Sequence, residues 1–321
     1  MTARSGSALV AASGLVVVGM LVAFQARANG GLADRLGGGF SGGAQAALVG
    51  FLVGLAVATA WVLVLPAQRR AVVAIPAELA RGRLPWWHCA AGLGGAFLIL
   101  TQSASVSRLG VAVFTVAVVA GQTGGSLAVD QVGLGPAGRQ PVTLRRMLAS
   151  IVAVGAVVLA VSGRFGSAGF SSVLLLLCIV AGVAVAGQSA LNGRIGQAVG
   201  SPVVAAWLNF VVGSAGLAVT VAVLVAAGHP LSALPSTWWL YTGGPLGLAF
   251  VVVVAASVRV VGVLLVSLAT VAGQVVGAVL LDAFAPASGQ TLRATTLAGA
   301  VVTVLAVAMA MDLRRKDRSP A

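Results

Sequence analysis

The chain has 321 residues, of which 59% are hydrophobic and only 8% are charged. Soluble domains carry about 25% charged residues, so this chain could not cover a water-facing surface, and we expect an integral membrane protein. The net charge of +13 does not indicate nucleic-acid binding, because the 19 Lys and Arg residues stand singly or in short clusters between apolar runs. Cys89 and Cys178 lie within apolar runs without a metal-ligand or disulfide spacing, so we expect no metal and no cofactor.

Apolar runs of the length that crosses a bilayer, about 20 residues, fall into two groups of five. In chain order they are 8–28, 42–65, 87–107, 110–131 and 146–163, then 170–192, 201–227, 237–257, 260–282 and 294–312. We interpret 8–28 as a span rather than a signal peptide, because its polar end recurs inside the chain in the run at 170–192. The sequence therefore predicts an all-α integral membrane protein with ten transmembrane helices.

The two groups of spans repeat each other. Residues 110–130, GVAVFTVAVVAGQTGGSLAVD, correspond at an offset of 152 to residues 262–282, GVLLVSLATVAGQVVGAVLLD. Trp86-Trp87 recurs as Trp238-Trp239 at the same offset, and the pair Gln25 and Asn29 recurs as Gln188 and Asn192 at an offset of 163. We therefore divide the chain into a five-helix repeat at 8–163, a second repeat at 170–312 and a basic tail at 313–321.

The basic residues predict how the chain is oriented. With ten spans, 14 of the 19 Lys and Arg residues fall on the side of the N-terminus, and cytoplasmic loops are the ones enriched in these residues. Both termini are therefore expected in the cytoplasm. Because each repeat has an odd number of spans, the second repeat would be inverted relative to the first. Inverted repeats are typical of transporters that work by alternating access, although channels contain them too.

Polar side chains inside the spans are the candidate binding residues. The amides that recur between the halves are Gln122 and Gln274 at mid-span, Gln25 and Gln188, and Asn29 and Asn192. A buried amide needs partners, which a substrate cavity or a neighbouring helix can supply, and both alternatives stay open. We expect Gln122 and Gln274 to approach each other near the bilayer midplane, with Asn29 and Asn192 lining the ends of one cavity. Amides at such a site would suit a neutral or hydrogen-bonding substrate.

Asp130 and Asp282 are the other repeated polar pair, each closing an apolar span. They are either coupling carboxylates or caps at the lipid interface that pair with loop arginines. Catalysis is not expected: the two His residues have no repeat relation, and no Walker-type GxxxxGK[ST] occurs.

The doubled motifs, together with the two sets of five spans, resemble the drug/metabolite transporter superfamily and, within it, the YdcZ-like family of bacterial inner-membrane proteins. The segments that carry the resemblance are Gln188-Ser-Ala-Leu-Asn192-Gly and Ala272-Gly-Gln-Val-Val-Gly277 with Asp282, and it extends over 8–312. It implies a ten-helix secondary carrier that hydrolyses no ATP and accepts cationic or amphipathic compounds. The related small exporters use a Glu in their first helix for proton exchange, whereas this chain has Gln25 and Gln188 there.

The leading hypothesis is a secondary-active transporter that moves a small molecule, a metabolite or drug-like compound, across the bacterial plasma membrane. Its expected partners are the substrate and the lipid bilayer, and no oligomer is required. The alternative is a membrane scaffold or assembly subunit that transports nothing, whose polar repeat residues would pack shut or face lipid. A channel is the third hypothesis, but the spans have few polar residues with which to line a pore.

Overall fold

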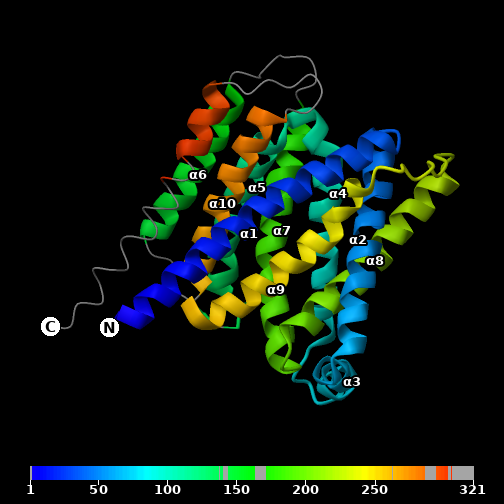
Figure 1. Cartoon of the computed structure of the whole chain (residues 1–321), viewed down its shortest axis with the longest axis vertical. Coiled ribbons are helices and arrows are strands. Elements are labelled where there is room, and N and C mark those ends of the chain that lie inside the picture. Colours follow the sequence, from blue (N-terminus) through cyan, green and yellow to red (C-terminus); the bar gives the residue numbers. More distant parts are fainter. Residues whose placement is uncertain are drawn as a thin grey trace.

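The computed structural model describes residues 2–136, 138–139, 144–162, 171–261, 263–285, 294–302 and 305, and every regular element in these ranges is a helix. The α-helices form an elongated bundle (Figure 1). Their bounds are α1 Thr2–Arg35, α2 Gly39–Val64, α3 Pro66–Ala80, α4 Ala91–Leu109, α5 Val111–Val132, α6 Leu144–Ser162, α7 Ser172–Ala198, α8 Pro202–Ala226, α9 Gly243–Val261 and α10 Val263–Phe284, followed by a helical segment at 294–302. Single 3₁₀ turns, η1 Trp86–Ala90 and η2 Trp238–Thr242, precede α4 and α9.

Six helical segments in the described ranges are long and apolar enough to cross a membrane. They comprise α1 from Gly14, α2, η1 with α4, α5, α7 and α8, and two shorter apolar segments occur at Trp238–Val254 and Thr270–Phe284. The expected spans at 146–163 and 294–312 lie partly outside the described residues. The chain is therefore a multi-helix membrane protein.

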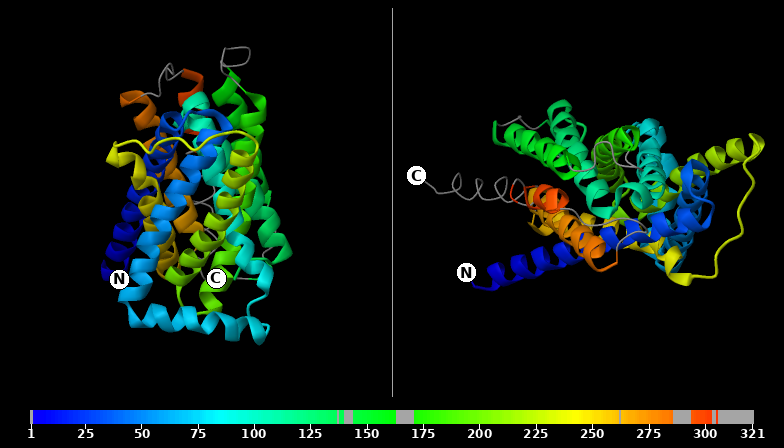
Figure 2. Two further views of the ribbon diagram at one scale, coloured as in Figure 1. Left: turned by 90° about the vertical axis from the view of Figure 1, so that its right-hand side faces the viewer. Right: turned by 90° about the horizontal axis from the view of Figure 1, so that it is seen from above.

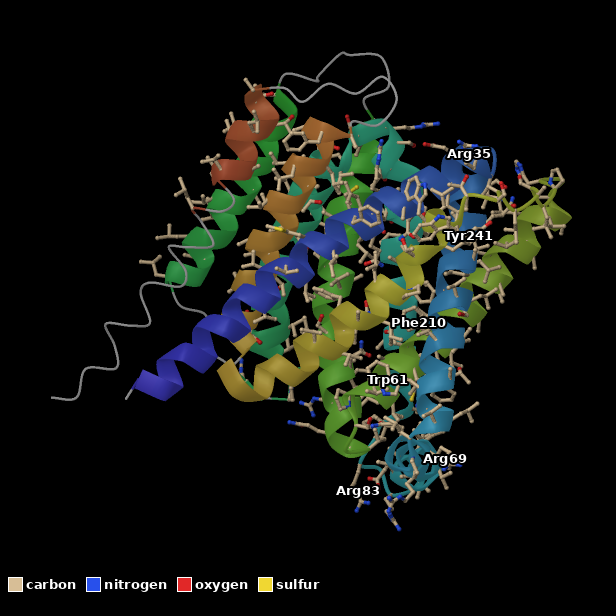
Figure 3. The ribbon with its side chains drawn as sticks, in the orientation of Figure 1. Arg35, Trp61, Arg69, Arg83, Phe210 and Tyr241 are labelled. Atoms are coloured by element: carbon tan, nitrogen blue, oxygen red, sulfur yellow. The ribbon has the colours of Figure 1, made fainter. Side chains whose placement is uncertain are left out.

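The basic segment at 66–86, which connects the expected spans 42–65 and 87–107, is largely helical. Pro66 starts α3, a position where its missing N–H costs nothing, and the helix lies across one end of the bundle (Figure 2). Glu78 of α3 is buried and accepts hydrogen bonds from Arg83 Nε and Nη2 at 2.5 Å. These hydrogen bonds lower the pKa of Glu78. Figure 3 shows Arg69 and Arg83 at this α3 end and Arg35 at the opposite end, which we call the Arg35 end.

Glycine and serine shape two of the reversals between helices. Gly110, with φ of 80°, ends α4 and begins α5, so a single residue joins the two helices. Ser201 caps α8 by accepting a hydrogen bond from the backbone N–H of Val204, after Gly200 with φ of 71°. Each of these connections is therefore at most three residues long.

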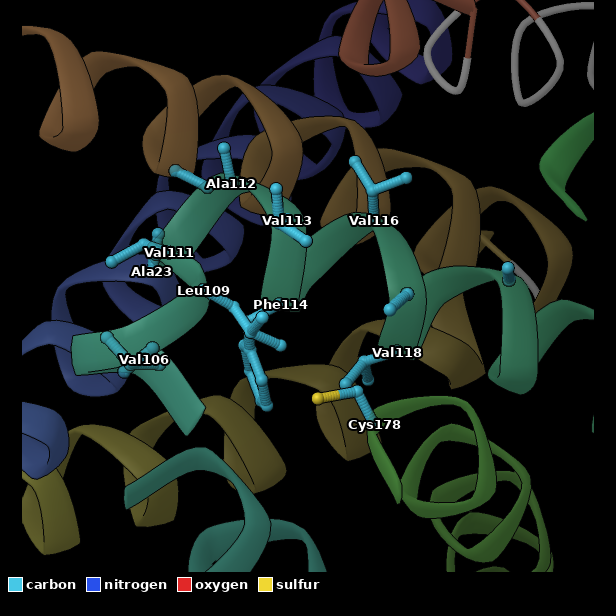
Figure 4. Close-up of a cluster of buried hydrophobic side chains, with 14 of the residues drawn as sticks. Ala23, Val106, Leu109, Val111, Ala112, Val113, Phe114, Val116, Val118 and Cys178 are labelled. Carbon is cyan, nitrogen blue, oxygen red and sulfur yellow. The ribbon is translucent and has the colours of Figure 1, made fainter. Parts of the chain in front are cut away.

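The two halves of the chain interleave in space. Helix α1 packs against α9 and α10 of the second half, while α7 packs against α4 and α5 of the first. The largest apolar cluster lies where α5 meets α7 and α10, and Cys178 of α7 lies beside Val118 of α5 within it (Figure 4). Burial of these side chains in the bundle therefore depends on both halves being present.

Helices cross most closely where glycines recur between the halves. A Cβ atom on Gly121 of α5 would lie 2.8 Å from the carbonyl carbon of Ile179, and one on Gly182 of α7 would lie 2.7 Å from Gln122 N. The same pattern joins α10 to α1: Cβ atoms on Gly273 and Gly19 would lie 2.8 Å from Val16 C and 2.9 Å from Gln274 N, respectively. Only glycine permits backbones to approach this closely.

Helices α2 and α8 cross through a second related set of residues. The rings of Phe51 and Phe210 lie 5.0 Å apart, and each covers a glycine of the opposite helix, Gly213 and Gly54, respectively. Phe51 and Gly54 correspond to Phe210 and Gly213 at an offset of 159. We call residues that correspond in this way, at offsets of 152, 159 or 163, counterparts.

Candidate functional site

A first group of amides, the Asn29 cluster, consists of Gln25, Asn29 and Gln102. Asn29 Nδ2 of α1 donates a hydrogen bond to Gln102 Oε1 of α4 at 2.6 Å, and the two residues are 1% and 2% exposed. Helix α9 has glycines where it faces these amides: a Cβ on Gly247 would lie 2.8 Å from Gln25 Nε2, and one on Gly243 3.0 Å from Asn29 Cγ. Asn29 Oδ1 is buried without a hydrogen-bond partner in the described chain. It is therefore an unused acceptor.

A second group, the Asn192 cluster, consists of Gln188, Asn192 and Asn209. Gln188 Nε2 and Asn192 Nδ2, both of α7, donate to the same oxygen, Asn209 Oδ1 of α8, at 2.9 and 3.4 Å. Gly95 of α4 leaves room for this cluster, since its Cβ would lie 2.9 Å from Gln188 Nε2. Asn192 Oδ1 is likewise buried with no hydrogen-bond partner among the described residues.

The two clusters are related but not identical. Gln25, Asn29 and Gly247 are counterparts of Gln188, Asn192 and Gly95. The counterpart of Gln102 is Val254, and that of Asn209 is Gly50. The partner amide therefore comes from α4 in one cluster and from α8 in the other. Neither Gln102 nor Asn209 is among the repeated amides, and the sequence signal for Asn209 is a single amide within the apolar run at 201–227.

The clusters lie toward opposite ends of the bundle. Asn29 is near the C-terminal end of α1, which ends at Arg35. Asn192 is near the C-terminal end of α7, close to the residues that pack against α3. Figure 3 places Phe210, the partner of Phe51, between Tyr241 toward the Arg35 end and Trp61 toward the α3 end. The aromatic pair therefore lies at an intermediate level of the bundle.

Burial also differs between the clusters. Gln25 is 8% exposed and Asn29 is almost fully enclosed, whereas their counterparts Gln188 and Asn192 are only half-buried. The same inequality separates Gln274, at 8% exposed, from Gln122, which is half-buried. The amide side chains next to the α1–α10 contact are therefore less exposed than those next to the α5–α7 contact.

Gln122 and Gln274 lie at separate helix crossings. The backbone of Gln122 faces Gly182 where α5 crosses α7, and that of Gln274 faces Gly19 where α10 crosses α1. Within the described part of the chain no hydrogen bond joins the two side chains. Their participation in a common site remains a prediction.

Asp282 caps a helix of the other half of the chain. Its carboxylate oxygens accept hydrogen bonds from the backbone N–H groups of Val111, at 3.2 Å, and Ala112, at 2.8 Å, at the start of α5. A carboxylate is favoured there because the first N–H groups of a helix lack partners and carry partial positive charge. Its counterpart Asp130 is half-buried near the end of α5. The end of α10 therefore meets the start of α5, so the two helices run in opposite directions.

In the described ranges, no group of three or more His, Cys, Asp or Glu side chains is arranged to hold a metal ion. What the interior does offer is a set of amides at two levels, each with an unpaired carbonyl oxygen. Such a set can bind a hydrogen-bond donor, and it contains no nucleophile with an adjacent base.

A family model described as "Putative inner membrane exporter, YdcZ" matches residues 10–159 and 173–309. The chain belongs to this family. Membership of the YdcZ family, part of the drug/metabolite transporter superfamily, confirms the resemblance drawn from the repeated motifs. With the apolar helices, it supports a multi-pass protein of the bacterial inner membrane with a transport role rather than an enzymatic one. None of the curated proteins compared with the chain matches it.

Proposed function

We propose that this YdcZ family member is a secondary-active exporter that carries a small molecule across the inner membrane by alternating access between two inverted five-helix repeats, 8–163 and 170–312. The observation that carries the proposal is the pair of amide clusters. They contain counterpart residues, lie toward opposite ends of the bundle and are unequally buried. A protein that exchanges two mirror-related conformations is expected to have one such site closed while the other is more open.

The inverted arrangement is supported by contacts between counterpart residues. The crossing of α5 and α7 uses Gly121 and Gly182, and the crossing of α10 and α1 uses their counterparts Gly273 and Gly19. The contact between the end of α10 and the start of α5 at Asp282 supports an inversion, rather than a translation, as the relation between the two crossings.

The substrate we propose is a neutral compound with N–H or O–H groups. In both clusters the asparagine uses its Nδ2 to donate to a neighbouring amide, which leaves its carbonyl oxygen as the unpaired atom. Hydrogen bonds within each cluster run from amide to amide, so a full positive charge entering the site would lose its hydration without gaining a carboxylate partner. A neutral donor satisfies the oxygens at lower cost.

Both termini are proposed to face the cytoplasm. The start of α1 lies toward the same end of the bundle as α3 (Figures 1 and 2), and Arg69, Arg70, Arg81 and Arg83 gather in and after α3. Clustered arginines favour the cytoplasmic side of a membrane. On this orientation the Asn192 cluster is near the cytoplasm and the Asn29 cluster near the outer face. In this proposal the substrate binds from the cytoplasm at Asn192, moves past Phe51 and Phe210, and is released to the outside at Asn29.

Export assays in liposomes test this function. Purified protein is reconstituted with a trapped mixture of neutral polyols, sugars and amides, and the loss of each compound is followed by mass spectrometry with and without a proton gradient. We expect some compounds to leave faster than from protein-free liposomes. We expect Asn29→Ala and Asn192→Ala each to slow that loss about fivefold, since a buried hydrogen bond is worth about 1 kcal/mol.

A matched control is Gln45→Leu. Gln45 is a buried amide of α2 that bonds Ser232 N and Pro230 O outside both clusters, so its removal should leave transport rates nearly unchanged. Equal loss from protein-containing and protein-free liposomes for every compound would contradict the transport function. Unchanged transport in the Asn192→Ala variant would contradict the site.

A further inference from the structure

We propose that Gln102 is a positioning residue that keeps the Arg35 end of the transport path closed by holding Asn29, and that the α3 end has no equivalent because Val254 stands at the counterpart position. The consequence for transport rests on the proposed function. The contact itself does not, because it can be measured without any substrate.

The hydrogen bond from Asn29 to Gln102 joins α1 to α4. Its N···O distance is 2.6 Å, and neither side chain is more than 2% exposed. One turn further along α4, the Val106 side chain packs against Gly30 of α1, whose Cβ would lie 2.9 Å from Val106 Cγ1. The two contacts together close α1 onto α4 near the Arg35 end.

The counterpart helices α7 and α9 are not closed onto each other. Helix α1 packs closely on α4, whereas α7 and α9 show no comparable packing in the described part of the chain. Asn192, the counterpart of Asn29, is held by Asn209 of the neighbouring helix α8 instead. Position 254, where α9 would carry the counterpart of Gln102, is a valine that packs against Leu15 of α1. Asn192 therefore has no partner amide on α9.

This difference in sequence gives the two conformations different stabilities. When the Arg35 end closes, the Asn29 amide gains a buried partner. When the α3 end closes, Asn192 meets a side chain that cannot form a hydrogen bond. A buried hydrogen bond changes an equilibrium by about two- to tenfold. The resting protein is thus biased toward the conformation with the Arg35 end closed, which is the one described above.

The test measures how readily a water-soluble thiol reagent reaches the α1–α4 interface. Cys89 and Cys178 are replaced by Ala, and Val106→Cys places a reporter thiol at the interface, where the native side chain is 1% exposed. In purified protein we expect Gln102→Met, which keeps the side-chain length but removes the hydrogen bond, to raise the labelling rate two- to tenfold. Gln45→Leu removes another buried amide, on α2, that does not join α1 to α4, and it should leave the rate unchanged.

A second variant tests the same idea without disturbing the Asn29–Gln102 pair. Val254→Gln supplies the missing amide to α9, which favours closure of the α3 end and hence opening of the Arg35 end. It should also raise the labelling rate of the reporter, and adding Gln102→Met should raise it further. Each variant is compared after it elutes as a single peak, at a temperature well below its thermal midpoint.

Unchanged labelling in both Gln102→Met and Val254→Gln would overturn the proposal, as would an equal increase in Gln45→Leu. If the labelling rates change as expected but no compound is transported by the unmodified protein, the positioning role stands and the transport function fails. If transport is found and labelling does not respond, the positioning role alone fails.

Discussion

Adding a single methyl group at Gly243 should disrupt the closed Asn29 cluster. Gly243 is the first residue of α9, and a Cβ there would lie 3.0 Å from Asn29 Cγ and closer still to Oδ1. Favourable carbon–carbon contacts begin at about 3.5 Å, so Gly243→Ala forces α9 away from α1 or rotates the amide of Asn29. Rotation would break the 2.6 Å hydrogen bond to Gln102 and leave Gln102 Oε1 buried and unpaired.

The cost can be bounded from these contacts. Overpacking of this kind costs about 1–3 kcal/mol, and an unpaired buried amide costs about 1–3 kcal/mol. Ala gains up to about 1 kcal/mol over Gly in a helix, so the net loss centres on about 3 kcal/mol, with a range of about 1–5 kcal/mol. For a chain of this size, each kcal/mol corresponds to about 2 °C in the unfolding midpoint, and we expect a fall of about 6 °C.

Thermal unfolding of the purified protein, followed by tryptophan fluorescence in detergent, measures the effect. Gly187→Ala is the control, because Gly187 lies within α7 and has nothing within 4 Å of its Cβ position. That variant should be as stable as the parent or about 2 °C more stable. If Gly243→Ala behaves like Gly187→Ala, Asn29 is not packed against α9 and the closed cluster is not present.

Three further outcomes are expected. Gly121→Ala and Gly273→Ala should each destabilise the protein by about 3 kcal/mol or more, because both place a Cβ against backbone that cannot rotate away, and midpoints equal to that of Gly187→Ala would refute the close crossings. Asp282→Ala should cost about 1–3 kcal/mol in unfolding free energy and increase hydrogen exchange at the start of α5, whereas faster exchange confined to α10 would contradict the capping role. Hydrogen bonds from Arg83 hold the pKa of Glu78 below 4.5. The stability contributed by the Glu78–Arg83 pair is therefore complete above pH 4.5 and is lost as the pH falls through that lowered pKa. The parent should therefore be more stable than Glu78→Gln at pH 7 and lose that advantage on acidification, and a stability gap independent of pH would count against the ion pair.

The sequence alone determined that this chain is a helical membrane protein, because so few charged residues could not cover a water-facing surface. It also located α2, α4, α5 and α8 to within four residues, since each is an apolar run of bilayer length bounded by glycine, proline or polar residues, whereas α7 extends six residues beyond its expected end. It failed at α3, where short apolar stretches and Pro76 within a basic segment look like a loop. That helix lies at the end of the bundle, and no bilayer-length run of apolar residues marks it.

Which amides meet was decided only by the tertiary structure. The repeat singled out Gln122 and Gln274, yet they lie at two different helix crossings, and at each crossing the adjacent glycines make the closest contacts. Internal repetition shows which residues are alike and says nothing about which helices touch. The partners of Asn29 and Asn192 are Gln102 and Asn209, whose counterparts, Val254 and Gly50, are not amides, so the repeat gives no signal for them. A side chain finds its partner through the way helices distant in the chain pack, and here that packing sets α1 against α4 but α7 against α8.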